Sequence, residues 1–219
     1  MNTLLNIFRR PELRNKIFAI LGLLAIAQVL HNIPIPAIDA SRLRDFLASN
    51  QPFGLLSSFT GGSLSTLSIA MLGVGPYITS SIIMQLMTMI FPALARMSKH
   101  EGELGRSRFN QYSRLLTVPL ALLQGYSFLT LLTRQDIIAP LSGGAMLGAL
   151  CVITAGSVLL MWIGEIISEY KLGNGVSLLI LAGIVSALPT QIQQAAFSYS
   201  PDQLFTYIAF VLVGLLVIA

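Results

Sequence analysis

Long uncharged stretches alternate with short polar segments along this chain. The runs that are free of Lys, Arg, Asp and Glu are 17–38, 46–95, 115–133, 137–164, 172–201 and 203–219. A helix needs about 20 apolar residues to cross a bilayer, and four of these runs fit one helix each. Because the runs are continuous rather than alternating, they favour membrane-spanning α-helices over the strands of a β-barrel.

The composition agrees with a membrane protein. Of the 219 residues, 54% are hydrophobic and 10% are charged, whereas soluble domains carry about 25% charged residues. So few charges cannot cover a soluble globule, and we predict an all-α integral membrane protein. The single cysteine, Cys151, excludes an internal disulfide. The last run reaches Ala219 without a polar flank, so we expect residues 201–219 to be an incomplete sixth span.

The run 46–95 is long enough for two crossings, but its first part is polar. Residues 46–63 read FLASNQPFGLLSSFTGGS. We expect a half-inserted, re-entrant segment there, followed by one crossing over about 70–92. Non-helical backbone at membrane depth is tolerated only where protein or a water-filled cavity surrounds it.

The basic residues favour one crossing rather than two. The chain has 13 Lys and Arg, and with one crossing all but Arg42, Arg44 and Arg134 fall on the side of the amino terminus. The positive-inside rule then predicts that this side is cytoplasmic, with an amphipathic leader at 1–16 and a loop at 96–114. The leader is either a surface helix on anionic lipid or an unstructured segment. The loop is either a solvated connector or a docking surface.

Residues 68–86, SIAMLGVGPYITSSIIMQL, interrupt the helical pattern inside a span. Pro76 lacks an N–H and clashes with the carbonyl one turn earlier, so the helix must bend or break near 72–76. Gly73 and Gly75 permit unusual dihedral angles there. Polar side chains follow the break, namely Ser80, Ser81 and Gln85. These side chains either hold helices together or line a path for a polar substrate.

No residue set predicts a catalytic or metal site, and we expect no cofactor. His31 and His100 have no acidic or Cys partner at metal-ligand spacing and are interpreted as interfacial polar residues. Glu165 and Glu169 lie four residues apart at the end of a span, where packing and topology are favoured over acid–base chemistry. The turn at 173–175, Gly-Asn-Gly, predicts that the spans on either side are antiparallel neighbours.

Three long motifs, in order, resemble the SecY family, the pore subunits of the bacterial Sec protein-conducting channel. They are LGVGPYITSSIIMQL, EGELGRSRFNQYSR and WIGEIISEYKLGNGVSLLILAGIVSALP, and IPIPAID after the first span fits as well. The resemblance implies two pseudo-symmetric halves of a clamshell channel. Residues 17–200 are then the amino-terminal half, with spans one to five. The chain departs from the family's usual pattern at Gln28, Ala37 and Gly75, outside the positions that match the pore ring.

The resemblance also assigns site residues. The pore ring, which blocks ions by dewetting, is matched by Val74, Ile78, Ile180 and Ile184. A plug at about 53–67 contains Phe53, Gly54, Leu55, Leu56, Phe59, Gly61 and Gly62. One side of the lateral gate contains Pro76, Ser80, Ser81 and Gln85. A cytoplasmic partner surface contains Lys99, Glu101, Arg106, Arg108 and Arg114.

The implied function is the central subunit of a channel that moves unfolded, signal-bearing polypeptides across the bacterial cytoplasmic membrane and laterally into it. Such a channel is not an enzyme; the SecA motor or a ribosome drives it, beside SecE and SecG-like subunits. No specific nucleic-acid sequence is implied. One alternative is a secondary transporter with broken helices, which needs a buried ionisable residue; none occurs within 46–95. Another alternative is a purely structural membrane subunit.

Overall fold

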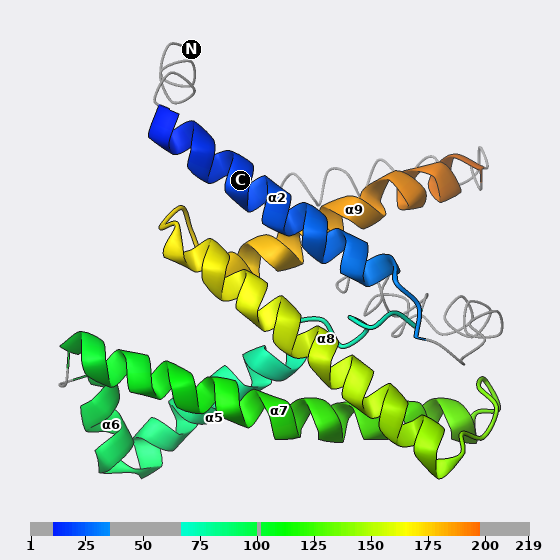
Figure 1. The fold of residues 1–219 in the computed structure, drawn as a ribbon, viewed down its shortest axis with the longest axis horizontal. Coiled ribbons are helices and arrows are strands. Elements are labelled where there is room, and N and C mark those ends of the chain that lie inside the picture. The colour runs from blue at the N-terminus through cyan, green and yellow to red at the C-terminus, as the bar shows by residue number, and fades with distance from the viewer. Residues whose placement is uncertain (1–10, 36–66, 100–101, 198–219) are drawn as a thin grey trace, which may run out of the picture.

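The computed structural model describes residues 11–35, 67–99 and 102–197 as a set of packed helices (Figure 1). The helices in this part of the chain are α2 (Pro11–Asn32), α5 (Gly75–Ile90), α6 (Pro92–Lys99), α7 (Gly102–Arg134), α8 (Gly143–Glu169) and α9 (Gly175–Phe197). Within the described ranges, three segments are long and apolar enough to cross a membrane: Glu12–Asn32, Leu104–Arg134 and Gly143–Glu169. The all-α membrane class that the sequence predicts is confirmed.

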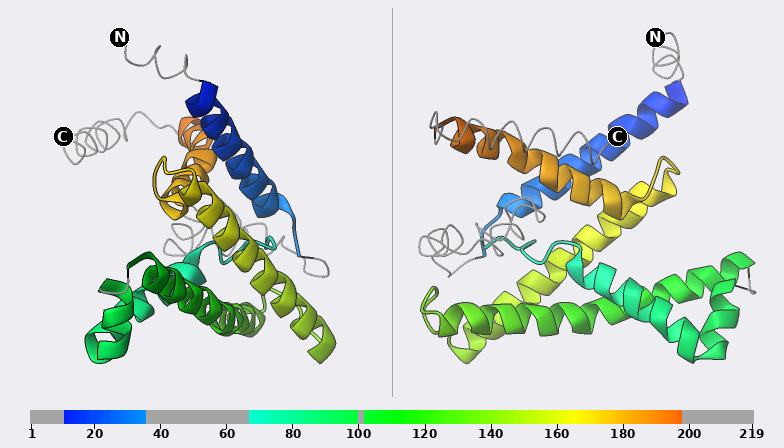
Figure 2. Two further views of the ribbon diagram at one scale, coloured as in Figure 1. Left: turned by 60° about the vertical axis from the view of Figure 1, so that its left-hand side comes forward. Right: turned by 180° about the vertical axis from the view of Figure 1, so that it is seen from behind.

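The helices form two groups that meet along α8. One group contains α2, α8 and α9, which contact one another, and the other contains α5, α6 and α7. Figure 2 shows α8 crossing from the first group to the second, where it packs against α7. Helices α8 and α9 are neighbours joined by the short Gly-Asn-Gly turn, as predicted, but Figure 1 shows them diverging from that turn at a wide angle rather than lying antiparallel side by side.

Two helices extend beyond the uncharged runs from which they were predicted. Helix α2 already includes Pro11–Lys16, so it takes up the end of the expected leader. Most of the expected loop at 96–114 is helical, because α6 ends at Lys99 and α7 begins at Gly102. The expected connection is therefore largely helical rather than irregular, because low polarity marks the extent of the membrane whereas a helix can continue past it; its cytoplasmic location stays a prediction.

The predicted break in the second span is confirmed and extends over residues 67–74, which form successive turns. Gly73 has φ of +57°, a left-handed conformation that suits glycine. The regular helix α5 begins only at Gly75, with Pro76 in its first turn. It ends at Ile90, and the capping residue Phe91 has an extended backbone (φ −107°, ψ 108°) that is typical of a residue before proline. At 16 residues, α5 is about 24 Å long.

The turn segment 67–74 is held between the end of α2 and the middle of α8. The amide of Ile35 donates to the Leu67 carbonyl at 2.9 Å, and the amide of Ile69 donates to the Ile33 carbonyl at 2.9 Å. On the other side, a Cβ at Gly156 of α8 would overlap the carbonyl oxygen of Ile69 and lie 2.7 Å from its carbonyl carbon. Glycine at 156 therefore permits the backbone of the turn segment to lie directly on α8.

Two buried apolar clusters stabilise this arrangement. The first joins the carboxyl end of α7 to the amino end of α8 and to the turn segment, through Ile35, Leu67, Met71, Leu129, Leu132, Ile137, Ile138, Ala149, Leu150 and Ile153. The second joins α2, α8 and α9 around Ala70 and Val74, through Ile20, Ala27, Leu160, Ile163, Ile167 and Leu179. The turn segment contributes to both clusters, so it connects the two halves of the core.

A short connection ends α8 and begins α9. The side-chain oxygen of Asn174 accepts hydrogen bonds from the amides of Val176 (3.0 Å) and Ser177 (3.2 Å), which caps α9. The hydroxyl of Ser168 accepts a bond from the amide of Gly175 at 2.9 Å. A Cβ at Gly175 would overlap the carbonyl of Gly164. The two helices therefore approach backbone to backbone at the turn.

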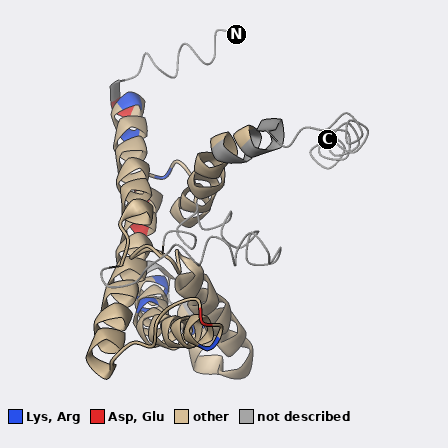
Figure 3. Ribbon diagram, turned by 90° about the vertical axis from the view of Figure 1, so that its right-hand side faces the viewer, with Lys and Arg blue, Asp and Glu red and all other residues tan. Residues whose placement is uncertain are grey.

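The outer faces of the helices suit a lipid environment. Large apolar side chains are exposed on helices of both groups, for example Phe18 (62%), Met89 (82%) and Leu147 (66%). Charged residues occupy few positions among the described residues and lie mainly near helix ends (Figure 3). So many exposed apolar side chains are unusual on a soluble monomer. They suit a surface that faces the hydrocarbon of a bilayer.

Candidate functional site: two cavities in series

An apolar cavity of about 290 Å³ lies where the turn segment meets α5, α8 and α9. Its lining consists of His31, Leu72, Gly73, Val74, Gly75, Ile78, Leu160, Leu179, Ile180 and Gly183. The break places Val74 just before α5, and the amide of Ile78 donates to the Val74 carbonyl at 3.0 Å. The two side chains are thus one turn apart even though the helix begins between them.

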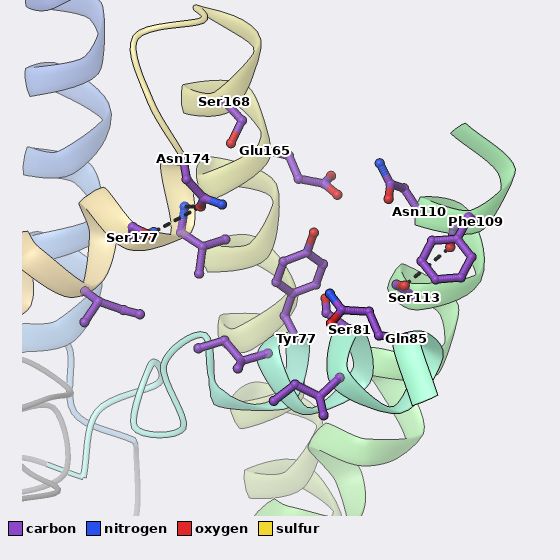
Figure 4. Close-up of a pocket in the computed structure, with 14 residues that line it drawn as sticks. Tyr77, Ser81, Gln85, Phe109, Asn110, Ser113, Glu165, Ser168, Asn174 and Ser177 are labelled. Atoms are coloured by element: carbon purple, nitrogen blue, oxygen red, sulfur yellow. Dashed lines mark hydrogen bonds between the residues drawn. The ribbon is translucent and has the colours of Figure 1, made fainter. Parts of the chain in front are cut away.

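A second, polar cavity of about 490 Å³ lies between α5, α7, α8 and α9 (Figure 4). Its lining consists of Tyr77, Ile78, Ser81, Ile82, Gln85, Phe109, Asn110, Ser113, Glu165, Ser168, Asn174, Val176, Ser177 and Ile180. In Figure 4, Tyr77 rises from α5 toward the space between Glu165 and Asn110. Hydroxyl and amide groups dominate this lining, so it offers both donors and acceptors to whatever enters.

Ile78 and Ile180 line both cavities and therefore form the boundary between them. The structure thus brings together three of the four residues that the resemblance matches to a pore ring: Val74, Ile78 and Ile180. The fourth, Ile184, is half-buried and lines neither cavity, because the apolar cavity ends at Gly183 on α9.

The residues matched to the lateral gate divide into two environments. Ser81 and Gln85 line the polar cavity. Ser80 is fully buried, and its hydroxyl donates to the backbone carbonyl of Ser113 at 2.5 Å, which holds α5 against α7. Pro76 is also fully buried. Two of these positions are therefore open to a polar cavity and two lie in packing contacts within the described structure.

An ion pair joins α7 to α8 beside the polar cavity, which Glu165 lines. The Nε atom of Arg114 lies 2.5 Å from Oε1 of Glu165. The Glu165 side chain is 17% exposed and the Arg114 side chain 43%. The sequence predicts a packing role for Glu165 and a partner surface for Arg114, and the pairing of the two is not apparent from their 51-residue separation.

The remaining candidate residues fall on the surface or outside the described residues. Arg106 and Arg108 are exposed on α7. Lys99 lies on α6, and nothing is described of its side chain. The residues outside the described ranges are His100, Glu101 and the plug residues Phe53, Gly54, Leu55, Leu56, Phe59, Gly61 and Gly62.

His31 is a cavity residue that the sequence interpretation misses. It is buried at the end of α2, its Nδ1 lies 2.8 Å from the Ala27 carbonyl, and it lines the apolar cavity. Its position follows from the pairing of residues 33–35 with 67–69, which carries the end of α2 to the break. No local sequence signal predicts that pairing.

Comparison with known proteins places the chain in a family. The SecY family model matches residues 68–219. The chain is 38% identical over 205 residues to the protein translocase subunit SecY of Corynebacterium glutamicum, covering 87% of this chain and 46% of that protein. It is 40% identical over 194 residues to the SecY of Synechocystis sp. (88% and 43% covered) and 38% identical over 225 residues to that of Staphylococcus aureus (99% and 51% covered). The chain thus spans about half the length of these relatives.

Two solved structures share the fold. One is described as Sec61 in the canine ribosome–channel complex from the endoplasmic reticulum, and the other as the structure of a protein conducting channel. Each has a TM-score of 0.62 and 19% identity, and each comparison covers 91% of this chain and 45% of the other. From the family match, the identities and the shared fold, we conclude that the chain belongs to the SecY family.

Proposed function

We propose that this chain forms one wall of a passive protein-conducting channel, which moves unfolded, signal-bearing polypeptides across the bacterial cytoplasmic membrane and laterally into it. The observation that carries this proposal is the pair of cavities in series, separated by Ile78 and Ile180. A polar chamber that ends at an apolar constriction lets a polypeptide approach while the constriction excludes water and ions.

The chemistry of the polar cavity suits an unfolded chain. Amide and hydroxyl side chains, among them Gln85, Asn110, Asn174 and Ser177, can donate to and accept from any peptide backbone. The acidic side chain in this lining, Glu165, is neutralised by Arg114. The lining therefore carries little net charge and attracts neither acidic nor basic polypeptides in particular. A channel that accepts polypeptides of any sequence requires such a wall.

The wider assembly belongs to the same proposal. Residues 53–67 serve as a plug, and α5 with α7 forms one side of a lateral gate. The basic ends of α6 and α7 face the cytoplasm beside the SecA motor or a ribosome, which supplies the driving force. SecE and SecG-like subunits brace the helices in the membrane. The family membership and the basic surface around Arg106 and Arg108 support these assignments.

The constriction is tested by ion leak through the reconstituted channel complex. We expect Ile78→Ser and Ile180→Ser each to increase resting single-channel conductance, because a hydroxyl at the boundary of the two cavities lowers the cost of wetting it. Leu181→Ser is the matched control: it changes the next residue of α9, which is 54% exposed on the outer face, and should leave conductance unchanged. Resting conductance that stays at the wild-type level in both isoleucine variants would remove these residues from the permeation path. Saturable uptake of a small solute would instead support a transporter.

A further inference from the structure

Helices α7 and α8 form a V whose closed end is apolar. At that end, Leu129 and Leu132 of α7 are buried with Leu150 and Ile153 of α8. A Cβ at Gly125 would already contact the Leu150 side chain at 3.4 Å, so the packing there is close. Figures 1 and 2 both show the two helices diverging from this end.

The open end of the V contains the polar cavity rather than apolar packing. Asn110 and Ser113 of α7 face Glu165 and Ser168 of α8 across this space (Figure 4). No apolar cluster among the described residues joins the two helices at this level. The direct polar link between the arms in this part of the chain is the bond from Arg114 to Glu165.

The same level of α7 is also tied to α5. The carbonyl of Ser113 accepts the hydroxyl proton of Ser80, so α5 follows α7 if the arm moves. Two adjacent residues of α7 thus contact different helices: the backbone carbonyl of Ser113 binds α5, and the side chain of Arg114 binds α8. A movement of Arg114 relative to Glu165 therefore moves the α5–α7 unit relative to α8.

We propose that the Arg114–Glu165 ion pair holds the open ends of α7 and α8 together and so sets the width of the polar cavity. Both residues act as positioning residues for the passage of a polypeptide, a role that rests on the proposed channel function. The apolar cluster at the closed end is the pivot, and the ion pair limits how far the α5–α7 unit swings away. Tyr77, which rises from α5 between the arms, moves with that unit.

The width is measured by the distance between two spin labels in the reconstituted channel complex. Cys151 is exposed, so a Cys151→Ser background is used. Labels at Ser107→Cys on α7 and Leu172→Cys beyond α8 occupy exposed positions at the two open ends. We expect Glu165→Gln and Arg114→Gln to lengthen the mean distance by about 2 Å or more, the scale of a hinge rearrangement, and to broaden its distribution.

Charge reversal and a conservative substitution show whether a change in the label distance comes from loss of the ion pair or from a general disturbance of packing. Arg114→Glu combined with Glu165→Arg should return the distance to the wild-type value, and Arg114→Lys should stay close to it because the opposite charges remain. The matched control is Arg134→Gln, which removes an exposed charge at the far end of the same helix and should leave the distance unchanged.

The proposal is overturned if the wild-type distance persists in the two glutamine variants, whatever their translocation rates. It is also overturned if the charge-reversed protein stays as wide as Glu165→Gln. If charge reversal prevents assembly, the contrast between Arg114→Lys and Arg114→Gln decides: equal distances in these two variants count against the ion pair. Because the distance needs no translocation, its outcome is independent of the conductance test of Ile78 and Ile180.

Discussion

At the scale of single residues, burial decides what the polar side chains within the second span do. Ser80, Ser81 and Gln85 have similar chemistry and lie within two turns of α5. Ser80 is fully buried and bonded to α7, whereas Ser81 and Gln85 line the polar cavity. The two interpretations that the sequence leaves open, packing contact and polar path, therefore apply to different residues of the same segment.

The role of Ser80 can be tested by removing its hydroxyl. Ser80→Ala should lower the free energy of unfolding by about 0.5–1.5 kcal/mol, the usual value of a hydrogen bond between membrane helices. The loss is modest because the Ser113 carbonyl keeps a second donor, the Thr117 hydroxyl at 2.8 Å. Denaturant titration of the purified complex gives the value, with the exposed Ser107→Ala as control. Equal stability of the Ser80→Ala and wild-type proteins would show that this bond does not hold α5 to α7.

At the scale of elements, close backbone approaches at glycines of α8 and α9 determine how the segments cross. Gly156 admits the turn segment, and Gly175 admits the backbone of Gly164. Small residues at such crossings are typical of membrane helices, where association depends on close packing rather than on a difference in hydrophobicity. The turn segment 67–74 can therefore remain non-helical at membrane depth, since protein surrounds it on both sides.

The crossing at Gly156 predicts a strong effect of one methyl group. Gly156→Ala places a Cβ against the Ile69 carbonyl, and we expect a loss of about 1–3 kcal/mol in stability from overpacking. Gly148→Ala is the matched control on the same helix, because no other segment lies within 4 Å of its added Cβ. That change should be neutral or stabilising by about 1 kcal/mol, as alanine favours helix over glycine. Similar thermal stabilities for the two variants would contradict the close crossing.

At the scale of the whole molecule, the ends of the helices group as the charge pattern predicts. The amino ends of α2 and α7 and the turn after α8 lie toward one end of the molecule, and the connection after α7 lies at the other (Figure 1). Arg14, Lys16, Arg106 and Arg108 belong to the first end. With the positive-inside rule, this grouping predicts a cytoplasmic side.

Cysteine accessibility in intact cells tests this orientation. In the Cys151→Ser background, a cysteine at Gln135, an exposed position after α7, should react with a membrane-impermeant maleimide added outside. Cysteines at Ser107 or Leu172 should react only after the cells are lysed, which also serves as the labelling control. Reaction of Ser107 and Gln135 from the same side would contradict the crossing of α7, and reaction of Ser107 from outside would contradict the predicted topology.

The helices and the break were predictable because their causes are local. Apolar runs of sufficient length specify spanning helices, and Pro76 after Gly73 and Gly75 prevents a regular helix at that point. Helix ends were less predictable: α7 begins at Gly102, well before the apolar run at 115. Polarity records where the lipid ends, and the backbone can remain helical in water beyond that boundary.

The amino-acid sequence by itself determined the membrane class, the interrupted second span, the side on which basic residues gather and the family motifs, because each depends on composition or on neighbours along the chain. Only the tertiary structure decided that Ile78 and Ile180 separate two cavities, that His31 lines one of them, and that Arg114 pairs with Glu165. These outcomes depend on the angles at which helices cross. Those angles are set by contacts between distant residues, such as Gly156 against Ile69, which no local pattern encodes.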